Sequence, residues 1–145
     1  MPSKLADQIV AEAESWVGTR FQHQGRLKHV GIDCVGFISE VARNAGVSDV
    51  DIPADYRPHE DGEAMKRLLK QHMKHVPTAQ VARGDVLALC DEALREPDVP
   101  RHLVIVKDVT PDTIFIIHAS QSGVKSHRLN SIWQKRIHSC WRIKK

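Results

Sequence analysis

Residues 31–38 read Gly-Ile-Asp-Cys-Val-Gly-Phe-Ile, and this stretch decides how the first part of the chain folds. Asp33 is a residue type that favours helix N-termini. After Cys34, apolar residues recur at helical spacing as far as Ala45, and Gly46 supplies a stop signal. The stretch therefore predicts a buried helix from Cys34 to about residue 46, with the cysteine in its first turn.

A cysteine in the first turn of a helix is a candidate nucleophile. The N–H groups there have no partner inside the helix and carry partial positive charge, which stabilises a thiolate. We therefore expect the pKa of Cys34 to be lowered, and the thiol to alkylate faster than Cys90 or Cys140. The alternative interpretation is a small buried apolar residue, the usual role of a lone cysteine.

The composition indicates one ordinary globular domain over residues 1–145. The net charge of +3 is not gathered in one block, so the sequence does not predict a nucleic-acid partner. Three widely spaced cysteines form neither a zinc motif nor a disulfide framework. No segment has the apolar run of a signal peptide or a membrane span. We therefore expect synthesis in the cytoplasm and no membrane partner.

Helix-type patterns come first in the chain and strand-type patterns second. Helices are predicted over about 4–17, 34–46 and 61–75, and strands over about 84–89, 102–106, 113–117, 124–129 and 137–143, the last an edge strand. Loops or extended surface segments are predicted over 19–32, 47–60 and 91–100. This order predicts an α+β fold, in which N-terminal helices pack on one side of an antiparallel sheet.

Two histidines stand at the ends of neighbouring predicted strands. His102 opens one strand and His118 closes the next, so antiparallel pairing through the turn between them places both at one edge of the sheet. A helix packed on that sheet could bring Cys34 to His102. In that arrangement His102 would take the thiol proton, and His118 would fix the tautomer of His102. The alternative is two solvent-exposed histidines at strand ends.

The remaining histidines and cysteines are interpreted as structural. His72 and His75 are three residues apart near the end of a predicted helix and could bind a metal, but we expect none. Cys90 and Cys140 lie in apolar strand patterns and are predicted to be packing residues.

Four segments, in this order, resemble the NlpC family of papain-like cysteine peptidases that act in bacterial cell-wall hydrolysis. They are Asp-Cys-Val-Gly-Phe at 33–37, Gly-Asp-Val-Leu at 84–87, Arg-His-Leu-Val-Ile-Val at 101–106 and Ile-His-Ala-Ser at 117–120. The resemblance implies a papain-like α+β fold with Cys34 as nucleophile, His102 as base and His118 as the third polar residue. It also implies cleavage of an amide bond in peptidoglycan stem peptides through a thioester, without a cofactor or metal.

Two further segments resemble small stand-alone members of the family that are encoded among bacteriophage tail genes. They are His23-Gln24-Gly25 and the stretch from His127 to Trp133. The resemblance implies phage tail proteins as partners. The implied setting is a virion tail, or delivery to the periplasm or cell wall by a route other than a signal peptide.

Two positions depart from the family pattern. Val35 stands where many members have a serine that helps to bind the substrate amine, and Phe21 stands where the family has an oxyanion-binding tyrosine. We expect Asp33 to pair with the amine, and His23 or the backbone N–H of Cys34 to bind the oxyanion. Gln121 is a further candidate for binding the substrate or the oxyanion, and Gln121 or a backbone carbonyl is the alternative to His118 as the third residue.

Two other functions remain open from the sequence. An amidase or acyltransferase of the same fold would share the thioester intermediate and the same residues. A non-catalytic module that binds a phage tail or the cell wall would keep the scaffold without using Cys34, His102 and His118 together.

Overall fold

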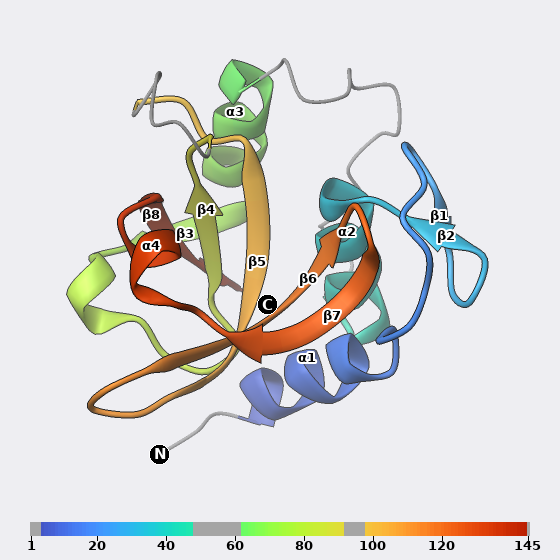
Figure 1. Ribbon diagram of the computed structural model, residues 1–145, viewed down its shortest axis with the longest axis horizontal. Coiled ribbons are helices and arrows are strands. Elements are labelled where there is room, and N and C mark those ends of the chain that lie inside the picture. The colour runs from blue at the N-terminus through green and yellow to red at the C-terminus, as the bar shows by residue number, and fades with distance from the viewer. Residues whose placement is uncertain (1–3, 48–61, 92–97, 145) are drawn as a thin grey trace.

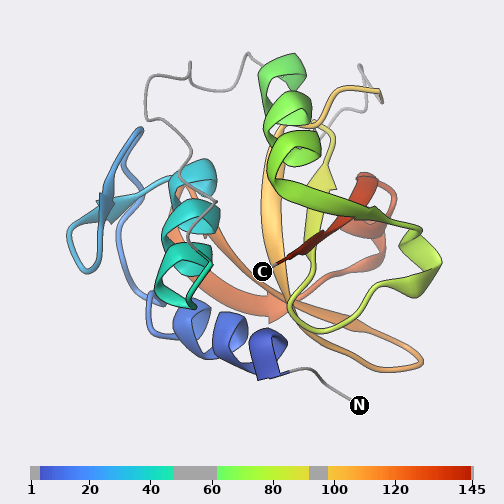
Figure 2. The same cartoon turned by 180° about the vertical axis from the view of Figure 1, so that it is seen from behind.

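The computed structural model describes residues 4–47, 62–91 and 98–144, which form a six-stranded antiparallel sheet with the longer helices packed on one face (Figures 1 and 2). The helices are α1 Lys4–Glu14, α2 Cys34–Asn44, α3 Gly62–His72 and α4 Ser131–Gln134, with a 3-10 turn, η1, at Thr78–Gln80. The strands of the sheet are β3 Met73–Val76, β4 Val86–Leu89, β5 His102–Val109, β6 Ile114–Ser120, β7 Gly123–Arg128 and β8 Ile137–Ile143. Their order across the sheet is β3-β8-β4-β5-β6-β7.

The predicted α+β architecture is confirmed, but the place of the last strand was predicted wrongly. β8 lies between β3 and β4 and is not an edge strand. The helix predicted to run to about residue 75 stops at His72, and the chain continues as β3, which pairs with the outer side of β8. His75 therefore lies in a strand, with its ring 5.2 Å from that of Trp141. Most of the predicted segments 47–60 and 91–100 lies outside the described residues.

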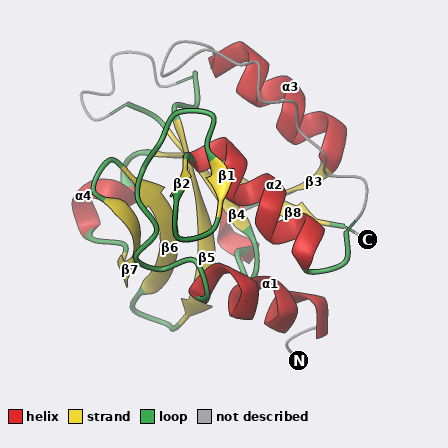
Figure 3. Cartoon of the chain, turned by 90° about the vertical axis from the view of Figure 1, so that its right-hand side faces the viewer, coloured by secondary structure: helices red, strands yellow, loops and turns green. Residues whose placement is uncertain are grey.

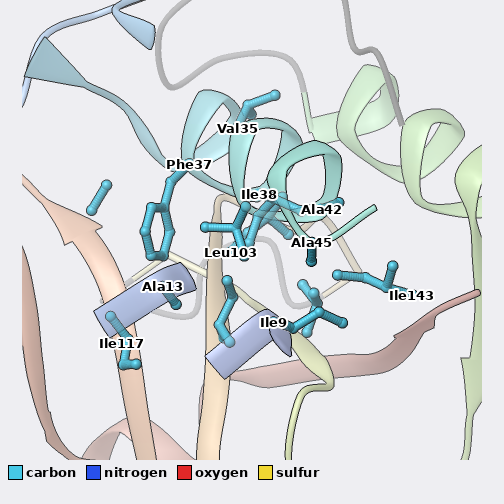
Figure 4. Close-up of a cluster of buried hydrophobic side chains, with 14 of the residues drawn as sticks. Ile9, Ala13, Val35, Phe37, Ile38, Ala42, Ala45, Leu103, Ile117 and Ile143 are labelled. Carbon is cyan, nitrogen blue, oxygen red and sulfur yellow. The ribbon is translucent and has the colours of Figure 1, made fainter. Parts of the chain in front are cut away.

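The sheet is covered on both faces, so it has two apolar cores. On one face, side chains of α1, α2 and α3 pack against alternate residues of the strands, including Leu103, Ile105 and Ile117 (Figure 4). On the other face, Val104, Val106 and Ile116 pack with Leu129, and α4 lies over this side (Figure 1). This explains why the central strands read as continuous apolar runs instead of alternating ones.

The loop before α2 carries a short two-stranded ribbon, β1 Arg26–Leu27 and β2 Gly31–Ile32. Figure 3 shows this ribbon beside the start of α2. The contact is close because a Cβ atom on Gly36 would lie 2.8 Å from the carbonyl oxygen of Gly25. The segment predicted as a plain loop over 19–32 therefore contains a short ribbon that packs against the first turn of α2, beside Cys34.

The turn before β4 joins the helical layer to the sheet. Gly84 has a φ of +87°, and a Cβ atom there would lie 3.0 Å from the Cα of Ala6 in α1. The next residue, Asp85, is buried and accepts hydrogen bonds from Arg142 of β8 at 2.8 and 2.9 Å and from the N–H of Ala82 at 2.9 Å. Gly84 and Asp85 thus fix the helix and the central strands relative to each other.

No helix in the described parts of the chain combines the length and the apolar character that crossing a bilayer requires.

We expect Asp85→Ala to lower the free energy of unfolding by about 2 kcal/mol, because the N–H of Ala82 and the Arg142 guanidinium lose their acceptor. The Arg142 side chain is 44% exposed, which keeps the loss below that of a fully buried pair. Urea unfolding measures the change. The control is Asp7→Ala, which removes an exposed partner of Arg83 and is expected to cost less than about 0.5 kcal/mol. Equal losses in both variants would contradict this role for Asp85.

Candidate active site

Cys34 is the first residue of α2, and Asp33 holds it there. Asp33 is the N-cap of the helix, and its Oδ1 accepts the N–H of Gly36 at 2.8 Å. Its Oδ2 accepts the N–H of Gln24 at 2.7 Å, which ties the preceding loop to the same carboxylate. The side chain that caps α2 therefore also holds the loop that precedes the helix.

The sheet opens next to this helix start. β5 begins at His102, but its pairing with β6 begins only at Ile105 opposite Ile117. Before that pair the two strands diverge, as Figure 1 shows. The N–H of Val106 donates to Asp85 on the β4 side, so the N–H of Leu103, three residues earlier, faces the β6 side. This N–H is one of the backbone hydrogen-bond donors that act to lower the pKa of the Cys34 thiol.

Cys34 and the histidines approach the open end of β5 from different faces of the sheet. α2 packs on the face that carries Leu103 and Ile117. His102 and His118 point to the other face by strand alternation, the face that carries Val104. The backbone N–H of Leu103 acts on the pKa of Cys34, and His102 is the residue before Leu103. The thiol therefore lies near the end of β5 that carries His102.

The predicted neighbourhood of His102 and His118 is confirmed. Nε2 of His102 lies 2.8 Å from Nδ1 of His118, although the two rings come from different strands. Burial, followed by the charges of His127 and Arg136, lowers the pKa of His118 to about 4. His118 is therefore neutral at physiological pH and can accept a hydrogen bond from His102.

A third histidine, which the sequence analysis did not single out for the site, extends this contact. Nε2 of His127 on β7 lies 2.8 Å from Nε2 of His118, and Nδ1 of His127 lies 2.9 Å from the carbonyl oxygen of Arg128. Trp133 packs edge-on against the rings of His118 and His127. The sequence places His127 in a predicted strand. That His127 shares a face with His118 follows only from the register of β6 and β7, which the sequence pattern does not reveal.

The expected lowering of the Cys34 pKa is wrong. Burial, followed by the negative charge of Asp33, raises it to about 12. The backbone N–H groups of Leu103, Val35 and Cys34 itself act in the opposite direction but do not outweigh these two effects. The helix N-terminus is present as predicted, but the half-buried thiol lies against the carboxylate that caps the same helix.

The residues predicted to bind substrate or oxyanion have different surroundings. Both Asp33 oxygens accept backbone N–H groups, and Nδ1 of His23 lies 3.7 Å from Oδ2 of Asp33. Gln121 is exposed in the turn between β6 and β7. Val35 is buried in the core, and Phe21 forms a backbone bridge to Ile32. The roles of Asp33, His23 and Gln121 toward a substrate stay predictions.

Within residues 4–47, 62–91 and 98–144, no group of three His, Cys, Asp or Glu side chains is arranged to hold a metal ion.

Comparison with known proteins gives one family and several related folds. A model of the NlpC/P60 family matches residues 18–142. No curated protein matches the chain. A Staphylococcus aureus protein described as similar to a lipoprotein of the NLP/P60 family aligns with a TM-score of 0.67 and 18% identity, over 100% of this chain and 43% of its own. An NlpC/P60 family protein of Bacillus cereus aligns with a TM-score of 0.67 and 16% identity, over 95% of this chain and 40% of its own.

A third solved structure belongs to a protein described as non-catalytic. RipD of Mycobacterium tuberculosis, described as adapted to a peptidoglycan-binding function, aligns with a TM-score of 0.50 and 15% identity. The alignment covers 89% of this chain and 98% of RipD. The chain spans less than half the length of the first two structures, and at these identities all three show a shared fold.

Replacing Asp33 with asparagine should lower the pKa of Cys34, because the substitution removes the carboxylate charge that helps to raise it. Asparagine keeps an oxygen that can cap the N–H of Gly36. The pH dependence of alkylation by iodoacetamide measures the shift. The control is Asp7→Asn, which removes an equal charge from the exposed surface of α1. An unchanged pH midpoint for Cys34 in Asp33→Asn would contradict the electrostatic role of Asp33.

The lowered pKa of His118 makes stability depend on pH. Between pH 6.5 and 4 the unfolded chain binds a proton on this ring and the folded chain does not, so the free energy of unfolding falls as the pH falls. We expect His118 to contribute a loss of roughly 2–3 kcal/mol over this range. Urea unfolding of the parent and of His118→Gln isolates this contribution, because glutamine does not titrate. Parallel stability curves for the two proteins would show that the assigned pKa is wrong.

Proposed function

The chain belongs to the NlpC/P60 family, and from this premise we propose that it is a cysteine peptidase cleaving an amide bond in peptidoglycan stem peptides. Proteins of this family act on peptidoglycan or bind it. The observation that carries the catalytic proposal is the hydrogen bond between His102 and His118. It lies at the end of β5 next to Leu103, whose backbone N–H acts on the pKa of Cys34. A purely binding role places no demand on these three side chains together.

In the proposed reaction Cys34 attacks the carbonyl carbon of the amide. Nδ1 of His102 takes the proton from sulfur as the C–S bond forms, and the carbonyl oxygen becomes an oxyanion. The backbone N–H of Cys34 at the helix start is the proposed donor to that oxyanion, with His23 as the side-chain candidate. When the C–N bond breaks, the imidazolium gives its proton to the leaving amine and a thioester remains. Water, deprotonated by His102, then hydrolyses the thioester and regenerates the thiol.

The raised pKa of Cys34 has a consequence for the first step. With a pKa of about 12 the resting residue is a thiol at neutral pH and not a preformed thiolate. Transfer of the proton to His102 must therefore accompany the attack on the carbonyl carbon. The proposed enzyme relies on its base more than a peptidase with a stable thiolate and imidazolium pair does.

The second candidate function is a non-catalytic module that binds peptidoglycan. Two observations favour it: the thiol is half-buried with a raised pKa, and the RipD structure shares the fold. An amidase or acyltransferase would use the same three residues and differ only in the acyl donor or acceptor. Products released from purified peptidoglycan distinguish all three.

We also propose a phage or prophage tail as the setting and tail proteins as partners. This rests on the resemblance of residues 23–25 and 127–133 to stand-alone tail-associated members of the family. Co-purification of this protein with tail proteins of the same phage or prophage would test this proposal.

Steady-state turnover of defined muropeptides, followed by mass spectrometry, tests the assigned roles. Cys34→Ala and His102→Ala should both abolish turnover, because nucleophile and base act as a unit. His118→Ala should leave measurable activity, since this residue only orients His102 and fixes its tautomer. His118→Gln should recover part of the loss, because its amide oxygen accepts the N–H of His102.

Each outcome bears on one assignment. Full activity of His102→Ala would overturn the mechanism. Activity of His118→Ala equal to that of the parent would place the third residue elsewhere. Binding of peptidoglycan without cleavage by the parent protein would favour the non-catalytic function.

A further inference from the structure

Three imidazole rings form one hydrogen-bonded chain that ends on a backbone carbonyl. The chain runs from His102 to His118 at 2.8 Å, from His118 to His127 at 2.8 Å, and from His127 to the carbonyl oxygen of Arg128 at 2.9 Å. It crosses β5, β6 and β7 on the face of the sheet opposite α2. The step from His118 to His127 joins diagonal neighbours, because His118 is opposite Lys125 and His127 lies two residues beyond Lys125 on the same face.

The carbonyl at the end fixes the direction of every hydrogen bond in this chain. A carbonyl oxygen only accepts, so Nδ1 of His127 carries the hydrogen and its Nε2 carries a lone pair. Nε2 of His118 must then donate to His127, which leaves a lone pair on Nδ1 of His118. That nitrogen accepts from Nε2 of His102. In neutral rings, one donor and one acceptor on each leave no other consistent assignment.

The hydrogen bond from His102 to His118 sets the tautomer of the proposed base. With its hydrogen on Nε2, His102 has its lone pair on Nδ1. The proposed mechanism requires this tautomer, because Nδ1 is the nitrogen that takes the proton of Cys34. When His102 becomes an imidazolium, Nε2 keeps its hydrogen and its bond to His118, so no other ring has to change during turnover. The hydrogen bonds between the three histidines therefore set the tautomer of His102 and do not move protons away from the site.

We propose that His127 is a positioning residue that, with the carbonyl of Arg128, holds His102 in the tautomer required of a general base. This inference rests on the proposed peptidase function for its catalytic meaning, but the tautomer itself is measurable without activity. It goes beyond the Cys-His-His set by assigning a role to a fourth side chain.

Burial and packing support this role. His118 is 1% exposed, so its Nε2 hydrogen needs a protein partner, and His127 supplies it. Trp133 packs edge-on against both rings, at 5.3 and 5.5 Å between centroids, and Asn130 caps the short helix that carries it. The neutral state required for the assignment agrees with the lowered pKa of His118. The segment from His127 to Trp133 thus becomes part of the site.

Substitutions at His127 can preserve or reverse the direction of the chain. In His127→Gln, the amide oxygen can accept from His118 while the amide NH₂ donates to Arg128, so the direction is preserved. In His127→Lys, the ammonium can only donate, so Nε2 of His118 must accept and the direction is reversed. His102 then carries its hydrogen on Nδ1, where it cannot take a proton from Cys34. His127 is exposed, so both substitutions are compatible with the fold.

Ser126→Lys is the matched control for the added charge. Ser126 is exposed on β7 next to His127, but it is opposite Ile117 and so points to the other face of the sheet. It adds the same ammonium group without contacting the histidine chain.

Long-range ¹H–¹⁵N correlation spectra of the imidazole nitrogens at pH 7.5 read the tautomers directly. We expect the parent, His127→Gln and Ser126→Lys to carry the His102 hydrogen on Nε2, and His127→Lys to carry it on Nδ1. In muropeptide turnover, kcat of His127→Lys should fall by roughly 100-fold or more, since a wrong tautomer disables a catalytic histidine. His127→Gln should stay within about threefold of the parent.

The two readouts separate this inference from the proposed function. A hydrogen on Nδ1 of His102 in the parent, or an unchanged His102 spectrum in His127→Lys, would overturn the inference whatever the activity. An equal loss of turnover in His127→Gln and His127→Lys would also overturn it, because direction would then not matter. A parent protein that shows the expected spectra but cleaves no muropeptide supports the tautomer assignment and contradicts the peptidase function.

Discussion

Two strands share a row of hydrogen bonds only while their backbones stay about 4.8 Å apart, and β5 and β6 stop doing so before they reach His102 and Ser120. The site depends on this separation. It leaves the Leu103 N–H without a partner on β6, and this N–H acts to lower the pKa of Cys34. A fully paired sheet would place a continuous layer of backbone between α2 and the histidines. The opening allows the start of α2 on one face and the histidine rings on the other face to approach the same end of β5.

Asp33 shows how a structural requirement changes the chemistry of its neighbour. One carboxylate caps α2 and holds the loop before it, which places Cys34 and covers it. The same negative charge, added to burial, disfavours the thiolate and raises the pKa of Cys34. The stabilised geometry thus comes with a less reactive resting thiol. Under the proposed mechanism this places more of the activation on His102 and on the residues that fix its tautomer.

The sequence was sufficient where local patterns decide the structure. The apolar spacing after Cys34 predicted α2, and the strand ends at His102 and His118 predicted their contact, because both follow from neighbouring segments. It was insufficient where segments distant in sequence meet. The strand at 73–76 was missed because its only sheet partner within the described residues is β8, almost seventy residues later. The sign of the Cys34 pKa shift depends on how the loop folds over the helix start, and the part played by His127 depends on the register of β6 and β7.

The position of β8 also bears on how the sheet is assembled. β5, β6 and β7 follow one another along the chain and can pair as hairpins, with short loop closures. β4 and β3, by contrast, gain a common neighbour only when β8, the last strand in the described chain, inserts between them. Until then each presents an unpaired edge, and such edges are templates for association with other chains. We therefore expect the half of the sheet that lies away from the histidines to form last and to be the source of aggregation during refolding.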